Sequence, residues 1–129
     1  MPTNPVSPDV FPRLREILHA VSSNYVATSD TPDNYSLNAR NLIYKKKPVF
    51  FAAVQRKKNY ITLHLMPLYM NPIMQAKVPP ELKKRMQGKA CFNFTAVDQE
   101  CFAELARLTA AGLKIFNSEK FRQTIQKMQ

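Results

Sequence analysis

The chain contains three consecutive segments with strand patterns, separated by connections that are short enough for hairpins. The segments are Leu37 to Tyr44, Val49 to Gln55 and Tyr60 to Met66. Short connections join antiparallel neighbours, because parallel strands need a crossover of roughly a dozen residues. The third segment alternates apolar and polar residues, whereas the second is apolar without interruption from Val49 to Val54. The sequence therefore predicts an antiparallel sheet in which Val49 to Gln55 is an interior strand.

Helical periodicity appears on both sides of these strands. Ser7 has the position of an N-cap, and apolar residues at helical spacing predict a helix that ends near Ser22. Towards the C-terminus, Asp98 is the predicted cap of a long helix, and Asn117 or Ser118 caps a last one. Both regions have one apolar face, so we expect them to pack against the sheet.

The remaining segments are shorter. Residues 27–35 are predicted as a loop, because Ser, Thr, Asp, Asn and Pro gather there. Residues 68–76 and 79–88 show helical patterns, the second closed by Gly88, and residues 91–94 form a fourth strand. The predicted fold class is α+β, with an antiparallel sheet of at least four strands packed against N- and C-terminal helices.

Length and composition predict one cytoplasmic domain over residues 1–129, of which residues 1–6 form a loose leader. Two glycines exclude the Gly-rich phosphate loops of nucleotide-binding proteins. No apolar run reaches the roughly 18 residues of a membrane-spanning helix, and the N-terminus lacks the pattern of a signal peptide. Cys91 and Cys101 are predicted to be reduced and at least partly buried thiols.

Positive charge is concentrated in the middle of the chain. Of the nineteen Lys and Arg residues, twelve lie between Arg40 and Lys89, together with a single acid, Glu81. The clustered bases, which predict weak contact with nucleic acid, are Lys45, Lys46, Lys47, Arg56, Lys57, Lys58, Lys83, Lys84, Arg85 and Lys89. The first two clusters lie at opposite ends of the second strand, roughly 26 Å apart at about 3.3 Å per residue. Exposed turns rich in lysine also serve solvation and the protection of sheet edges.

Hairpin parity divides the strand residues between two faces of the sheet. Connections of even length align Ile43, Phe50 and Leu65 on the core face, with Asn41, Ala52, Leu63, Ala39, Val54 and Ile61. The opposite face then carries the candidate ligand-binding residues Arg40, Phe51, Tyr60, Thr62 and His64. In this arrangement Arg40 would hold a small anion, His64 would form a hydrogen bond beside it, and Phe51 would supply an apolar wall. A connection of odd length would move Arg40 to the other face, and a covering helix would close the site.

Three short runs resemble a known family. They are Lys47 to Ala53, Lys58 to His64 and Gly88 to Phe94, and their order and spacing resemble the YdhG-like family, a bacterial domain of unknown function. The resemblance covers about residues 36–112. It implies a single α+β domain with an antiparallel sheet and a bacterial cytoplasmic origin. Some relatives are labelled frataxin-like iron chaperones, so the resemblance also implies iron handling as an alternative function.

The residues themselves predict a non-enzymatic binding or accessory protein without a cofactor. His19 and His64 are the two histidines, and neither has a nucleophile or a second metal ligand spaced to join it. Glu100 and Glu104 share a helix face, but hard cations need several converging oxygens, so no metal site is predicted. Candidate partners are a small anionic ligand or, more weakly, nucleic acid, with no membrane. A monomer and a homodimer remain open.

Overall fold

The computed structural model of the chain describes residues 6–127, without the side chain of Asn41. Its helices are α1 (Val10–His19), the 3-10 turn η1 (Ser22–Asn24), α2 (Met66–Met70), α3 (Pro72–Ala76), α4 (Pro80–Lys83), α5 (Gln99–Asn117) and α6 (Glu119–Lys127). Its strands are β1 (Tyr25–Thr31), β2 (Asn34–Tyr44), β3 (Lys47–Arg56), β4 (Ile61–Leu65), β5 (Met86–Gln87) and β6 (Cys91–Phe94). The predicted α+β fold class is confirmed.

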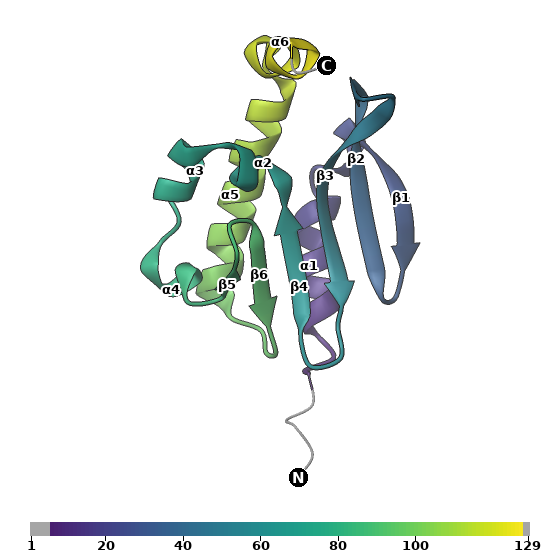
Figure 1. The fold of residues 1–129 in the computed structure, drawn as a ribbon. Coiled ribbons are helices and arrows are strands. Elements are labelled where there is room, and N and C mark those ends of the chain that lie inside the picture. The colour runs from purple at the N-terminus through teal and green to yellow at the C-terminus, as the bar shows by residue number, and fades with distance from the viewer. Residues whose placement is uncertain (1–5, 128–129) are drawn as a thin grey trace.

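The described strands form one six-stranded sheet in the order β1-β2-β3-β4-β6-β5, with antiparallel neighbours throughout. Strand β3 is interior, as its uninterrupted apolar run predicted. Helices α1 and α5 lie together behind the sheet in Figure 1, and α6 crosses its end. In the part of the chain that the structure describes, no helix crosses the opposite face of β3 and β4 (Figure 1).

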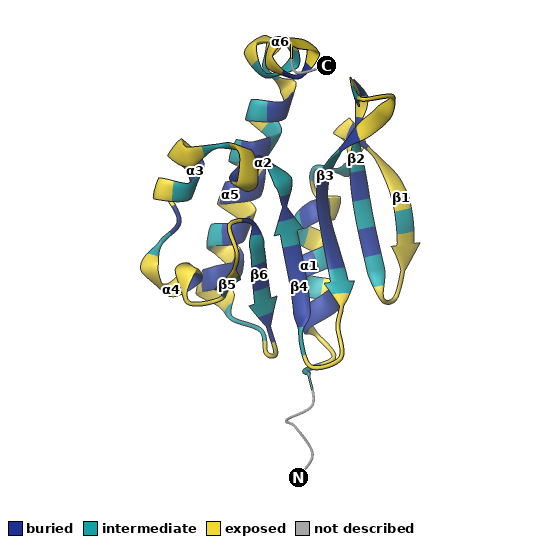
Figure 2. Ribbon diagram, viewed as in Figure 1, coloured by how far each residue is buried: buried dark blue, intermediate teal, exposed yellow. Residues whose placement is uncertain are grey.

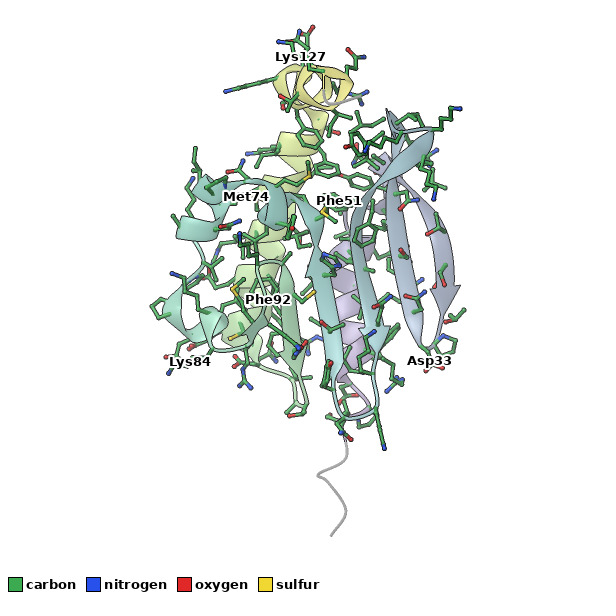
Figure 3. The ribbon with its side chains drawn as sticks, in the orientation of Figure 1. Asp33, Phe51, Met74, Lys84, Phe92 and Lys127 are labelled. Carbon is green, nitrogen blue, oxygen red and sulfur yellow. The ribbon has the colours of Figure 1, made fainter. Side chains whose placement is uncertain are left out.

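The core lies between the sheet and the α1–α5 layer, where Figure 2 shows buried residues on both elements. Leu14 of α1, Leu63 of β4 and Leu105 of α5 are fully buried there. Near α6, where Figure 3 labels it, the ring of Phe51 stacks on Tyr25 at 4.0 Å and meets Phe116 edge-on at 5.2 Å. Fully burying an aromatic side chain of this kind contributes roughly 2–3 kcal/mol, so this cluster anchors α5 to the sheet.

Two segments differ from the sequence prediction. Residues 27–35, predicted as a loop, contain most of β1 and the start of β2. Strand β1 lies at the edge of the sheet and is exposed along most of its length, so the sequence carries no apolar alternation there. Gly88 was predicted to end a helix, but with φ +74° it forms the turn between β5 and β6.

The N-terminus also differs in detail. Helix α1 begins at Val10 rather than beside Ser7, whose backbone N–H instead donates to the Thr95 carbonyl at 2.9 Å. Of the predicted leader, residues 1–5 lie outside the described residues, and Val6 packs against the core. The predicted N-caps of the two C-terminal helices agree better with the structure than the predicted N-cap at Ser7. The Asp98 carboxylate accepts from the Cys101 N–H at 3.1 Å, and the Ser118 hydroxyl accepts from the Phe121 N–H at 3.2 Å.

The pairing of β2 with β3 is irregular, and this changes the predicted faces. Leu37 pairs with Ala52, but the next residue, Asn38, pairs with Phe50, so β3 carries one extra residue at Phe51. Such a bulge inverts the alternation of side chains on its two sides. Phe51 therefore points towards the helices, and Phe50 points to the open face. The core prediction is confirmed for the set Ala39, Ala52, Val54, Ile61, Leu63 and Leu65, which are all buried.

The prediction is wrong for Phe50, which is half-buried, and for Ile43, which is 45% exposed. Asn41 lies outside the described side chains. The β3–β4 register also differs, because Ala52 pairs with Leu65 rather than with Leu63. This shift of two residues leaves each side chain on its predicted face.

The close approach of α5 to α2 gives a stability prediction. A Cβ added at Gly112 would lie 2.9 Å from Cγ and 3.0 Å from Cβ of Pro67. We expect Gly112→Ala to lower the free energy of unfolding by about 1–3 kcal/mol, although alanine favours a helix by about 1 kcal/mol over glycine. Chemical denaturation measures the change. On the exposed side of the same helix, Ala110→Gly should destabilise by only about 1 kcal/mol. A more stable Gly112→Ala protein would contradict the close contact.

Candidate functional site

The five residues predicted as a ligand site do not come together. Thr62 and His64 lie on the open face, in rows with Asn93 and Cys91 of β6. Tyr60 precedes β4 and is held in the turn, where its carbonyl accepts from the Lys57 N–H at 2.8 Å.

Phe51 and Arg40 belong to the other side of the sheet. The bulge turns Phe51 into the core beside Tyr25. Arg40 lines a pocket together with Tyr25 and Phe116, both of which are core residues. The predicted polar-face site is therefore divided between the two sides of the sheet.

The open face carries an uncharged cross-strand row. His64 lies between Ala53 of β3 and Cys91 of β6, and its ring meets Phe50 edge-on at 5.1 Å. Burial lowers the pKa of His64 and raises the pKa of Cys91, while the Thr62 hydroxyl and Lys57 act against the rise at Cys91. Both shifts favour the neutral imidazole and the neutral thiol. This is the opposite of the thiolate–imidazolium pair that a nucleophilic cysteine needs.

The lowered pKa of His64 predicts a loss of stability in acid. The unfolded chain binds a proton near the ordinary histidine pKa of about 6.5, whereas folded His64 resists protonation. Its contribution to stability is therefore complete above about pH 6.5 and falls as the pH drops towards the folded pKa. The melting temperature of the wild type should fall more between about pH 7.5 and pH 5 than that of His64→Gln. Equal falls would show that burial does not perturb His64.

A small polar pocket lies where η1, β2, α5 and α6 meet. Its volume is about 210 Å³. Its lining residues are Ser23, Asn24, Tyr25, Ala39, Arg40, Leu42, Phe116, Asn117 and Arg122. Tyr25 pairs with Ala39 across β1 and β2, which places the phenol ring beside the strand that carries Arg40. The Ser118 cap sets the corner between α5 and α6, which brings Arg122 to the same pocket.

The pocket combines positive charge with a buried hydroxyl. Among the described lining residues, two are arginines and none is acidic. Tyr25 is only 3% exposed, and its hydroxyl finds no hydrogen-bond partner in the described part of the chain. Burial raises the pKa of Tyr25, so the phenol stays protonated and can donate a hydrogen bond. An unsatisfied buried hydroxyl costs about 1–3 kcal/mol, and an acceptor bound in the pocket would remove that cost.

The sequence had identified Arg40 but not the other members of this pocket. Tyr25 precedes the segment predicted as a loop, and Arg122 lies on the polar side of the last predicted helix. The position of Tyr25 depends on a long-range contact, the stacking of its ring on Phe51. The aromatic residue at position 25, at the start of a Ser- and Thr-rich segment, was the one local signal of a partly buried edge strand.

The predicted polyanion residues are distributed over separate elements. Lys45, Lys46 and Lys47 surround the β2–β3 turn, and Lys83, Lys84 and Arg85 lie at α4 and just after it. Figure 3 shows Lys84 and Asp33 at the end of the molecule away from Lys127 of α6.

Several of these bases already face acids. Arg56 pairs with Asp33 at 2.9 Å, Lys84 with Glu81 at 3.1 Å, and Arg85 with Asp98 at 3.6 Å. Exposed pairs of this kind contribute little to stability, but they reduce the charge that is available to phosphates. Contact with nucleic acid stays a prediction.

Within residues 6–127, no group of three or more His, Cys, Asp and Glu side chains is placed to hold a metal ion. Cys91 and Cys101 are free thiols, half-buried and buried respectively. The described helices include none with the length and apolar character needed to cross a bilayer. No protein-family model, curated protein or solved structure matches the chain. The resemblance to the YdhG-like family therefore stays a prediction.

Proposed function

We propose that this protein is a non-enzymatic binding protein for a small anion, which it holds in the pocket formed by Tyr25, Arg40 and Arg122. The observation that carries the proposal is the Tyr25 hydroxyl, which is buried beside two arginines and has no hydrogen-bond partner among the described residues. A protonated phenol and two guanidinium groups offer donors, so the missing partner is an acceptor. An anion is such an acceptor, and its negative charge would also suit the Arg40 guanidinium on the pocket wall.

The dimensions of the pocket limit the ligand. About 210 Å³ suits an ion of the size of phosphate, sulfate or a short carboxylate rather than a nucleotide. Guanidinium groups bind such oxyanions with paired hydrogen bonds, which are roughly twice as strong as neutral ones. The formal net charge of +10 would also draw anions towards the protein.

The chemistry of the lining supports binding rather than turnover. None of its described side chains is a carboxylate, an imidazole or a thiol, the groups that most often act as general bases or nucleophiles near neutral pH. The His64–Cys91 pair lies on the other face of the sheet. A cytoplasmic location belongs to the same proposal and rests on the sequence. Iron handling, the alternative implied by the YdhG-like resemblance, has no comparable observation in its support.

Calorimetric titration with inorganic phosphate, sulfate and acetate tests the proposal. We expect a single site, and we expect Arg40→Gln to weaken binding by about tenfold or more, because hydrogen bonds to charged groups contribute about 1.5–3 kcal/mol. Lys77→Gln removes the same charge from an exposed position that is not part of the pocket. The control should bind as the wild type does. Equal affinity in Arg40→Gln and Lys77→Gln would refute the assignment of the site.

The substitution Tyr25→Phe should raise the stability of the unliganded protein and lower its affinity for the anion. Removing an unsatisfied buried hydroxyl should raise the free energy of unfolding of the unliganded protein by about 1 kcal/mol. The same change removes a donor, so anion affinity should fall by about tenfold. Thermal melts with and without phosphate measure both quantities. A Tyr25→Phe protein that is less stable without ligand would mean that the hydroxyl already has a partner.

A further inference from the structure

A second and larger cavity lies where the β2–β3 hairpin faces α2 and α6. It has a volume of about 650 Å³. Its walls include Tyr44, Phe50, Met66, Tyr69 and Ile125. Lys45 and Lys47 also line it, both are exposed, and no acid is found among its described lining residues. The cleft is thus apolar with a positive edge.

The turn that carries these lysines is strained. Lys45 has φ +49° and Lys46 has φ +69°, and a two-residue turn joins Tyr44 to Lys47. Hairpin turns with two residues of positive φ favour Asn-Gly, because a lysine side chain fits this conformation poorly. The Lys45 ammonium lies 5.3 Å from the centre of the Tyr44 ring, over the cleft wall. Strained conformations of this kind gather at functional sites, where the side chain is needed for another purpose.

We propose that this cleft binds an amphipathic anion, a molecule with an acyl or aromatic body and one carboxylate, sulfonate or phosphate group. The body would lie among Tyr44, Phe50, Met66 and Tyr69, and the anionic group would lie at Lys45 and Lys47. The methionine side chain adapts to apolar bodies of different shape. The two lysines disfavour a cationic ligand, and they give a purely apolar ligand no advantage.

The size of the cleft and the small apolar surface around it favour a small molecule over a protein partner. Its volume lies within the roughly 300–1,000 Å³ of small-molecule sites. Tyr69 is 59% exposed, and nearby in sequence Ile73 of α3 is 69% exposed. A stable protein interface would need about 1,000 Å² or more of buried surface, which is more than a few exposed apolar side chains provide. The site is separate from the Arg40 pocket, with which it shares no lining residue.

Three ligands with the same ten-carbon body and different head groups test the proposal. Below their micelle concentrations, decanoate should bind at least about tenfold more tightly than decanol or decylamine, a difference that charge-assisted hydrogen bonds to lysine can supply. Calorimetry, supported by the NMR shifts of Tyr44 and Tyr69, measures affinity and location. Decylamine binding as tightly as decanoate would overturn the proposal.

The variant Lys45→Asn/Lys46→Gly removes a cleft lysine and introduces the Asn-Gly pair that this turn favours. It should therefore melt at a higher temperature than the wild type. In this double variant and in Lys47→Gln, the ratio of the affinity for decanoate to the affinity for decanol should shrink severalfold. Lys114→Gln, on the exposed side of α5, should keep the preference. Arg40→Gln should also keep it. Loss of decanoate binding in Arg40→Gln alone would move the ligand to the Arg40 pocket and overturn the proposal. A dimer that is detected by sedimentation, covers Tyr69 and excludes decanoate would also overturn the proposal.

Discussion

The bulge at Phe51 determines which side chains of β3 face the helices, and both cavities depend on it. A regular strand would continue the alternation from Ala52 and Val54 and place Phe50 in the core. The extra residue turns Phe51 inwards, where it stacks on Tyr25 and meets Phe116. Tyr25 and Phe116 then form part of the Arg40 pocket. Phe50, turned outwards by the same bulge, becomes a wall of the larger cleft.

The sequence predicted well the features that depend on local periodicity. The interior position of β3 followed from an apolar run, and the Asp98 cap followed from a carboxylate placed just before an amphipathic segment. The opposite faces of β4 followed from strict alternation between Ile61 and Leu65. In each of these cases, one segment contains all the information that the prediction needs.

The candidate site could not be predicted in the same way, because it depends on register. Parity assigned Arg40 and His64 to one face, and it holds only while each strand stays regular. Strand β2 has a further irregularity between Asn38 and Ile43, so Leu42 is buried and Ile43 is exposed. No residue type in the sequence marks either irregularity. Arg40 remains the residue to which the prediction assigned the anion, but its neighbours are Tyr25 and Arg122 rather than His64.

We propose that an anion completes the hydrogen bonding of the Tyr25 hydroxyl between Arg40 and Arg122. Crystals soaked in selenate, an oxyanion with a strong anomalous signal, test it most directly. We predict an anomalous peak in the pocket, with a selenate oxygen about 2.5–3.0 Å from the Tyr25 hydroxyl oxygen. Selenate bound only at the surface lysines, with the Tyr25 hydroxyl still unpaired, would contradict the claim.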